Sequence, residues 1–261
     1  MSEKRYDMTG VSEHYDNLLA PYYAWICGGS ELKFEENRLF FQFHGIRPTQ
    51  SGIAVDLGAG PGFQSIPLSQ AGFKVIAIDG CHDLLMELKS HGAGLPIVTF
   101  EDDLRNFTEH IAGKVELIVC MGDTLTHLQT LAEVRALLEE GCRALEDNGR
   151  LILGFRDLSA ELKNLDRFIP VRSDSKRIFT CFLEYEEKHV KVHDIIHEKT
   201  GNQWVMKKSY FRKLRIPPLW MSECLRNTGF AIEGSEINNG MLTIIARRPE
   251  EGWQPAINSP P

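Results

Sequence analysis

The chain lacks any apolar stretch of about 20 residues, which is the length that a helix needs to cross a bilayer. Its first residues, Met-Ser-Glu-Lys-Arg-Tyr-Asp, lack the apolar run of a secretory signal. The six cysteines lie far apart, with no Cys-x-x-Cys pair and no cysteine–histidine spacing typical of a metal site. These absences predict a cytoplasmic protein that holds no metal and contacts no membrane.

Positive charge is also scarce, with 29 lysines and arginines against 36 acidic residues and a formal net charge of -7. A nucleic-acid partner requires a basic face that releases counterions from the phosphates. The one basic stretch, Lys207 to Arg215, mixes its charges with apolar residues, as in a strand with one solvated face. The charge balance therefore argues against nucleic-acid binding.

With 261 residues, of which 43% are hydrophobic, the chain can bury a full core. The first fifty residues look helical, and short apolar runs typical of strands buried on both faces follow them. These runs are Ile53–Leu57, Val75–Ile78, Ile97–Phe100, Val115–Cys120 and Leu151–Phe155. Helix-like stretches separate them, at Gly62–Ala71, Asp83–Ser90 and Leu131–Leu145. The alternation predicts an α/β fold with a doubly wound, mostly parallel sheet.

After Asp157 the pattern changes, since residues 177–216 show β-rich runs separated by turn residues. A helix is expected at Leu219–Thr228, and Asn238-Asn239-Gly240 predicts a hairpin between strands at Ala231–Ile237 and Met241–Arg247. We therefore predict an N-terminal helical segment (1–50), a core (51–176 and 217–248), an antiparallel β insertion (177–216) and a flexible tail (249–261).

A glycine-rich turn follows the first predicted strand, in Asp56-Leu57-Gly58-Ala59-Gly60-Pro61-Gly62-Phe63. Glycines allow backbone N–H groups to approach a ligand closely. Asp79 ends the second strand, where a carboxylate can accept hydrogen bonds from both ribose hydroxyls of an adenosine. Phe63 is too large for the last slot of a dinucleotide fingerprint, and no Tyr-x-x-x-Lys pair is present, which disfavours a nicotinamide oxidoreductase.

The run Asp56 to Gly62 resembles motif I of the class I S-adenosylmethionine-dependent methyltransferases, and the resemblance extends in order over most of the chain. It implies a seven-stranded Rossmann-like sheet, S-adenosylmethionine as cofactor and S-adenosylhomocysteine as product. It also implies that Asp103 and Leu104 hold the adenine, with Asp102 as the competing assignment. The cofactor residues implied are Asp56, Gly58, Ala59, Gly60, Gly62, Asp79, Gly80, Asp102, Asp103, Leu104 and Met121.

The segment Cys120 to Leu128 resembles the glycine and sarcosine N-methyltransferases, which have Leu-Gly-Asn-Ser-Phe followed by His-Leu, with Asp123 in place of their Asn. Arg156 matches the arginine with which that group holds a substrate carboxylate, although Phe155 replaces their histidine. A surface ion pair is the alternative reading of Arg156. The two departures favour another amine or carboxylate-bearing small molecule over glycine.

The N-terminal residues His14-Tyr15-Asp16 and Tyr22-Tyr23-x-Trp25 resemble the lid of these small-molecule enzymes, with Tyr23 and Trp25 near the substrate. Aromatic faces suit a sulfonium, although packing of a helix on the sheet explains them equally well. We predict Tyr15, Asp123 and His127 as candidate proton acceptors in the N-methylation of a small molecule; for His127, a capping role is an alternative. An O-methyltransferase and a non-catalytic S-adenosylmethionine-binding protein are alternatives for the whole chain. The insertion either covers the acceptor pocket or forms a homo-oligomer contact.

Overall fold

The computed structural model describes residues 9–238 and 240–250. Seven strands form one sheet in the order β10-β11-β5-β4-β1-β2-β3. Neighbouring strands are parallel except around β11, which is antiparallel to both β5 and β10. The predicted doubly wound, mostly parallel sheet is confirmed. Its strands are β1 (Ile53–Leu57), β2 (Lys74–Asp79), β3 (Ile97–Glu101), β4 (Val115–Cys120), β5 (Leu145–Arg156), β10 (Ala231–Asn238) and β11 (Met241–Arg247).

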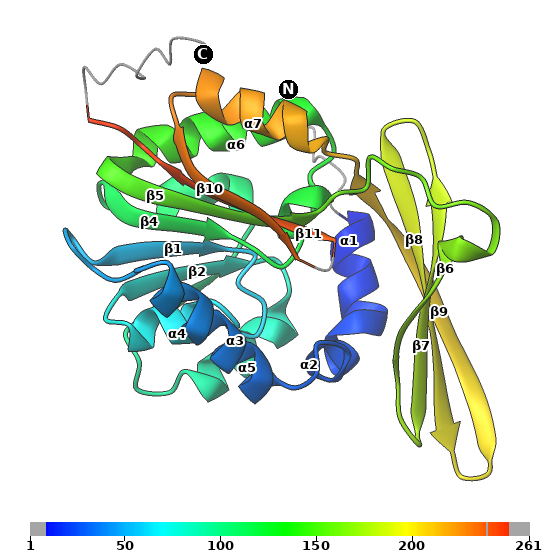
Figure 1. The fold of residues 1–261 in the computed structure, drawn as a ribbon. Coiled ribbons are helices and arrows are strands. Elements are labelled where there is room, and N and C mark those ends of the chain that lie inside the picture. The colour runs from blue at the N-terminus through cyan, green and yellow to red at the C-terminus, as the bar shows by residue number, and fades with distance from the viewer. Residues whose placement is uncertain (1–8, 239, 251–261) are drawn as a thin grey trace, which may run out of the picture.

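Helices cover both faces of this sheet (Figure 1). One layer holds α3 (Ser30–Phe43), α4 (Ser65–Gln70) and α5 (His82–His91), and the other holds α6 (Leu131–Ala144) and α7 (Pro218–Asn227). All six residues of β4 are buried, as expected of a central strand whose two faces are both covered. The α4 helix starts three residues later than the predicted Gly62, because the glycine turn runs on to Gln64.

A second sheet follows the core strand β5 and contains β6 (Phe168–Ser173), β7 (Arg177–Tyr185), β8 (His189–Thr200) and β9 (Gln203–Leu214). Its strands pair antiparallel in chain order. The insertion predicted for 177–216 therefore begins earlier, at Phe168, and the predicted core limit of 176 is wrong. The strand β6 is a short, exposed edge strand that contains Pro170. Such a strand needs no alternation of apolar and polar residues, so the sequence does not predict it.

The N-terminal residues lie between the two sheets (Figure 1). They form α1 (Thr9–His14), the short helices η1 (Tyr15–Leu19) and η2 (Ala20–Tyr22), and α2 (Tyr23–Ile26). Leu18, Leu19 and Tyr22 are buried in one apolar cluster with residues of β7, β8 and β9. The insertion thus packs on the N-terminal segment through a core of its own.

Two predictions fall partly outside the described residues. Of the tail predicted for 249–261, residues 251–261 lie outside them, and so does Asn239 in the predicted hairpin turn. Among the residues that are described, no helix is both long and apolar enough to cross a membrane.

A buried carboxylate fixes the entry to β1. Glu116 on β4 accepts hydrogen bonds from Thr49 N and Thr49 Oγ1 at 2.6 and 2.7 Å, and from Gln50 N and Gly52 N at 3.0 and 2.9 Å. Burial by itself would raise the pKa of Glu116, but these donors outweigh it and hold the pKa below its ordinary value. The charged form is therefore the one that the fold stabilises.

We expect Glu116→Gln to lower the free energy of unfolding by about 1–3 kcal/mol, because an amide nitrogen cannot accept two of these hydrogen bonds. Because the folded pKa of Glu116 is lowered, its carboxylate stabilises the fold at pH values above the unfolded pKa. This stabilisation is lost as the pH falls through the folded pKa. Urea unfolding at neutral pH, and again below the ordinary value of 4.5, measures both effects. Exposed Glu139→Gln is the control; equal stability of the two variants would contradict the assignment.

Candidate active site

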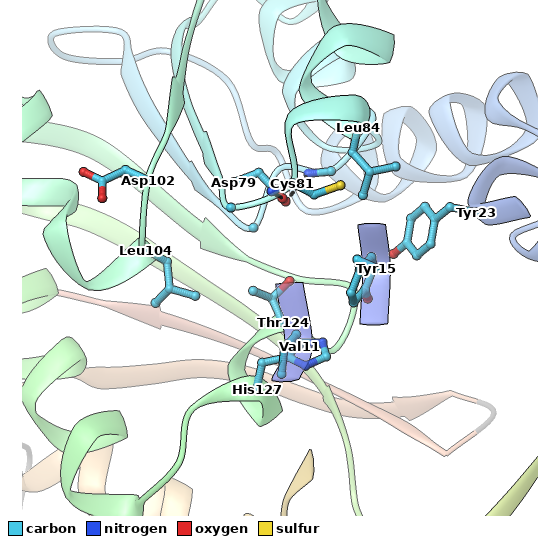
Figure 2. Close-up of a pocket in the computed structure, with 13 residues that line it drawn as sticks. Val11, Tyr15, Tyr23, Asp79, Cys81, Leu84, Asp102, Leu104, Thr124 and His127 are labelled. Atoms are coloured by element: carbon cyan, nitrogen blue, oxygen red, sulfur yellow. Dashed lines mark hydrogen bonds between the residues drawn. The ribbon is translucent and has the colours of Figure 1, made fainter. Parts of the chain in front are cut away.

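A pocket opens at the carboxyl ends of the core strands, beneath the N-terminal helices (Figure 2). It encloses about 630 Å³, including space open to solvent. This is the position at which doubly wound sheets bind ligands, and the volume suits a nucleoside-sized molecule. The residues that line it are Val11, Tyr15, Tyr23, Gly58, Gly60, Asp79, Gly80, Cys81, Leu84, Asp102, Leu104, Thr124 and His127.

The glycine turn contributes Gly58 and Gly60 to the pocket wall. Both have positive φ, 76° and 51°, which a residue with a side chain rarely adopts. A Cβ on Gly58 would lie 2.2 Å from Thr124 Cγ2, and one on Gly62 would lie 2.3 Å from Leu88 Cδ1. The turn is therefore glycine-rich both to bring its backbone to the pocket and to pack on the next elements.

Three predicted cofactor residues of this motif, Asp56, Ala59 and Gly62, lie behind the pocket wall, outside its lining. Asp56 is fully buried and accepts a hydrogen bond from Ser65 Oγ at 2.6 Å, which ties β1 to the start of α4. Burial raises the pKa of Asp56 to about 7. Asp56 is therefore placed to support the glycine turn.

Asp79 joins the turn to the end of β2. Its Oδ2 accepts from Gly60 N and its Oδ1 accepts from Cys81 N, both at 2.8 Å. Each oxygen retains a second lone pair, so the carboxylate can also accept from a ligand hydroxyl in the pocket that it lines. Burial raises the pKa of Asp79, and the two N–H donors counter this. Gly80, also predicted, lines the same wall.

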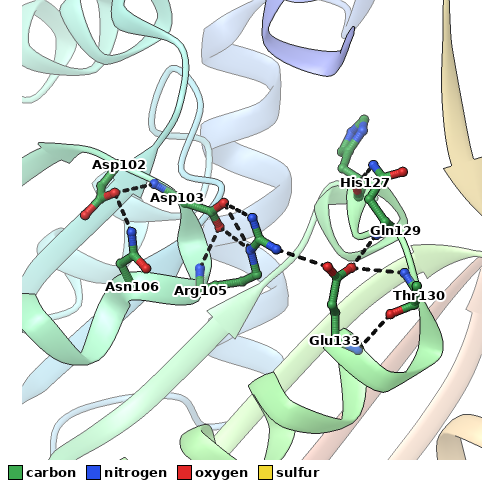
Figure 3. Close-up of polar contacts among 8 residues, drawn as sticks. All are labelled: Asp102, Asp103, Arg105, Asn106, His127, Gln129, Thr130 and Glu133. Carbon is green, nitrogen blue, oxygen red and sulfur yellow. Dashed lines mark hydrogen bonds and ion pairs between the residues drawn. The ribbon is translucent and has the colours of Figure 1, made fainter. Parts of the chain in front are cut away.

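The two acids after β3 have different positions (Figure 3). Asp102 lines the pocket, and its oxygens accept from Asn106 Nδ2 at 2.9 Å and pair with His110 Nε2 at 2.7 Å. Asp103 is the N-cap of η3 (Leu104–His110) and forms an ion pair with Arg105, which in turn reaches Glu133 at 3.1 Å. The Asp103 side chain is thus committed to this network, and the geometry favours the competing assignment, Asp102, together with Leu104.

The aromatic residues of the predicted lid divide between two places. Tyr15 and Tyr23 line the pocket with ring centroids 5.9 Å apart, and Tyr23 stacks on Phe63 at 5.9 Å. Trp25 points elsewhere: its Nε1 donates to Asp174 Oδ2 at 2.6 Å, and Arg172 and Arg177 lie over its ring. Trp25 therefore packs on the insertion sheet and lies outside the lining of this pocket.

Asp123, predicted as a proton acceptor, is buried and fully hydrogen-bonded outside the pocket lining. It pairs with Lys213 of β9 and accepts from Arg156 N at 2.9 Å and Thr126 Oγ1 at 3.1 Å. Burial would raise the pKa of Asp123, but Lys213 and the Arg156 N–H hold it below its ordinary value. The carboxylate is a structural anion that joins the insertion to the core.

The two predicted residues beside Asp123 also lie outside the pocket lining. The Arg156 side chain is exposed at the end of β5, and Met121 uses its carbonyl to accept from Thr124 Oγ1 at 3.0 Å. Neither position gives direct access to the adenosyl side of the pocket.

His127 ends η4 (Thr124–His127) and lies at the pocket wall next to Tyr15, with ring centroids 5.8 Å apart. Its other face stacks on Phe211 of β9 at 5.4 Å. Burial and the nearby Lys213 charge lower the pKa of His127 to about 3, so the imidazole is neutral near pH 7. Its Nδ1 has no hydrogen-bond partner in the described part of the chain.

Several pocket residues were not predicted from the sequence. Val11, Cys81 and Leu84 belong to no motif, and Thr124 lies in the segment Cys120 to Leu128 without having been singled out. Lys213 was visible only as one charge in a basic strand, and its pairing with Asp123 depends on contacts between residues 90 positions apart.

The fold and the pocket define a Rossmann-like domain with N-terminal helices over the pocket and an inserted sheet. Residues 54–149 match the family model described as a methyltransferase domain. A glycine/sarcosine N-methyltransferase of Aphanothece halophytica is 32% identical over 105 residues, which are 40% of this chain and 40% of that enzyme. The chain thus spans about two fifths of the length of the curated relatives it matches.

Solved structures resemble nearly the whole chain. An S-adenosylmethionine-dependent methyltransferase of Clostridium acetobutylicum has a TM-score of 0.69 at 15% identity, covering 92% of this chain and 98% of that one. The sugar N-methyltransferase KedS8 of Streptoalloteichus has a TM-score of 0.62 at 12% identity, covering 85% and 87%. At these identities the likeness shows the fold, which this chain shares with those methyltransferases.

We expect Asp102→Ala and Asp103→Ala to act differently. Asp102→Ala should weaken S-adenosylmethionine binding about 10-fold, because it removes a carboxylate from the pocket wall. Asp103→Ala should instead lower the free energy of unfolding by about 1–2 kcal/mol, since it removes a helix N-cap. Calorimetric titration and urea unfolding of both variants measure this division. A larger loss of cofactor affinity in Asp103→Ala would restore the opposite assignment.

Proposed function

We propose that the chain transfers the methyl group of S-adenosylmethionine to the amine nitrogen of a small molecule. The observation that carries the proposal is the continuous pocket that joins the glycine turn and Asp79 to the buried groups under the N-terminal helices. The cofactor supplies a methyl group on a sulfonium, from which an amine displaces a neutral thioether. The protein's part is to hold both reactants collinear and away from water, which can contribute roughly 7–11 kcal/mol.

The residues present fit the adenosyl part of this cofactor. Gly58 and Gly60 offer a wall without side chains, Asp79 offers ribose acceptors, and Asp102 with Leu104 lies where the adenine would end. Pro61 lacks an N–H donor, which matters little for a ligand without a pyrophosphate. Five other predicted cofactor residues lie outside this lining and in this proposal support it from behind: Asp56, Ala59, Gly62, Asp103 and Met121.

The N-terminal helices and the insertion form the acceptor half in this proposal. Tyr15 and Tyr23 would face the sulfonium, and their aromatic rings favour a cation. Arg156 remains the proposed anchor for a substrate carboxylate at the outer rim, beside the buried Lys213–Asp123 pair. The names of the relatives support an amine acceptor, since they include glycine/sarcosine and sugar N-methyltransferases. The cytoplasmic location and the homo-oligomer contact stay predictions.

The function is tested by titrating the protein with S-adenosylmethionine and, separately, with NADH in a calorimeter. We expect binding of the former alone. Transfer of a labelled methyl group is then measured against pools of amines, phenols and carboxylates, with label expected in the amine pool. Label in phenols alone would favour O-methylation, and tight cofactor binding without any label would favour a non-catalytic binding protein.

Asp79→Asn should weaken S-adenosylmethionine binding about 10- to 100-fold, because a charged acceptor of the ribose hydroxyls contributes roughly 1.5–3 kcal/mol. Asp83→Asn, an exposed acid on α5, is the matched control and should bind as the parent chain does. Thermal unfolding without cofactor shows whether the turn itself has been damaged. Unchanged affinity in a folded Asp79→Asn variant would contradict the ribose role.

A further inference from the structure

The pocket at the carboxyl ends of the core strands is acidic. Asp79 and Asp102 belong to its lining, and no lysine or arginine is among the described residues that line it. The histidine of the lining, His127, is neutral near pH 7, because burial and the Lys213 charge lower its pKa to about 3. Lys213 itself is paired with Asp123. A wall of this kind favours a cation over a neutral molecule of the same shape.

A third acid, Asp56, lies directly behind this wall. It is fully buried on β1, two residues before Gly58 of the lining. Its Oδ2 accepts from Ser65 Oγ at 2.6 Å, whereas Oδ1 is buried and has no hydrogen-bond partner in the described part of the chain. The charge that shifts its pKa there is that of another acid, Asp79. A buried carboxyl without a cation pays the full cost of desolvation when it ionises, so its neutral form is favoured.

Charge at the pocket wall acts on Asp56. Burial raises the pKa of Asp56 to about 7, hydrogen bonds from Ser65 counter this, and the negative charge of Asp79 raises the pKa further. Asp79 lines the pocket (Figure 2), so the field of a charge at that wall reaches Asp56. A positive charge in the pocket acts with the opposite sign and favours the Asp56 carboxylate.

The other titratable groups around Asp56 are less free to respond. Burial raises the pKa of the Cys120 thiol on β4 far above its usual range, and Asp56 and Asp123 add to this, so the thiol stays neutral. Burial would raise the pKa of Asp123, but Lys213 holds it below its ordinary value, so Asp123 stays a carboxylate. Both oxygens of Asp79 accept from backbone N–H groups, at 2.8 Å, which stabilise its charged form. Asp56 is thus the acid whose charge depends most on what the pocket holds.

We propose that Asp56 lets the site distinguish S-adenosylmethionine from S-adenosylhomocysteine by charge, because Asp56 releases its proton to solvent when the sulfonium binds. This rests on the cofactor of the proposed function. The two molecules share their adenosyl, amino and carboxyl groups and differ by one methyl group and one positive charge. Once the methyl group is on the amine and sulfur has kept the electron pair of the broken C–S bond, Asp56 takes a proton back from solvent. The charge that favoured the cofactor then no longer holds the product.

Linkage fixes the sign of the expected pH dependence. A cation in the pocket lowers the pKa of Asp56, so S-adenosylmethionine gains affinity as the pH rises through about 7 and loses it as the pH falls. With a shift of about one pKa unit, the Kd of S-adenosylhomocysteine divided by that of S-adenosylmethionine should rise about 5- to 10-fold between about pH 5.5 and about pH 8.5. Taking this ratio removes the titration of the α-amino group that both ligands carry.

Proton release is a second measurement, and it needs neither a variant nor an acceptor. Calorimetric titrations near pH 7 in phosphate and in Tris, whose ionisation enthalpies differ, count the protons that each ligand releases. S-adenosylmethionine should release about 0.4 proton more than S-adenosylhomocysteine, since a shift of one unit from a pKa of about 7 raises the ionised fraction of Asp56 from about 0.5 to about 0.9.

Variants assign the response to Asp56. Asp56→Asn keeps the shape of the side chain but cannot ionise, so the ratio of the two Kd values should lose its pH dependence. Ser65→Ala removes a donor that stabilises the carboxylate, so the midpoint of the dependence should move to higher pH. Ser69→Ala is the matched control and should leave the midpoint unchanged. Ser69 is a buried serine of the same helix, α4, whose hydroxyl has no hydrogen-bond partner among the described residues.

The inference is overturned if the parent chain shows equal pH dependence of the two affinities, or equal proton release by the two ligands. A folded Asp56→Asn variant that keeps the pH-dependent ratio of the parent would also overturn it and would assign the response to Asp79. Thermal unfolding without ligand shows whether the variant is folded, and the two parent measurements decide the question if it is not. Failure of the parent chain to bind S-adenosylmethionine at any pH would instead overturn the proposed function.

Discussion

The Asp123 carboxylate is the interaction on which the assembled site depends. Asp123 follows the carboxyl end of β4 and has a left-handed backbone, with a φ of 76°. Its carboxylate accepts a hydrogen bond from Arg156 N of the core strand β5. Its partner Lys213 comes from β9, so one buried ion pair fixes the insertion over the ends of β4 and β5. Removing one partner of a buried pair leaves an uncompensated charge, at a typical cost of about 3–5 kcal/mol. The rings of Phe211 and His127 meet because β9 is held there.

The parallel core could be predicted from the sequence because its strands are covered on both faces. Runs such as Ile53–Leu57 and Val115–Cys120 are apolar except for one acid each, Asp56 and Glu116, and their observed limits agree with the predicted ones. The edge strand β6 could not be predicted, since an exposed strand with Pro170 needs no apolar pattern. The glycine turn was predictable for a different reason: positive φ and close packing admit few residues other than glycine.

The site residues differ in the same way. Positions set by strand ends could be predicted from the sequence, whereas environments set by distant parts of the chain could not. Gly58, Gly60 and Asp79, which were predicted to bind the cofactor, line the pocket because their places follow from strand ends. Asp102 and Asp103 are neighbours in sequence. Their roles differ because Asp103 forms an ion pair with Arg105, which also pairs with Glu133. The environments of Tyr15, Asp123 and His127 arise from burial and from charges on other elements, which no local pattern encodes. Trp25 is drawn away from the pocket by Asp174, Arg172 and Arg177 of the insertion, which the sequence does not reveal as neighbours.

In the proposed function, most of the groups around the cofactor and most of those around the acceptor come from different parts of the chain. The segment that matches the methyltransferase domain, residues 54–149, contains the glycine turn, Asp79, Asp102 and His127. Tyr15, Tyr23 and Lys213 lie outside it, on η1, α2 and β9. In a methyl transfer, the cofactor half needs only one geometry, whereas the acceptor half must match the size, charge and proton count of each substrate. Under the proposed function, substrate choice follows from how the N-terminal segment and the inserted sheet meet.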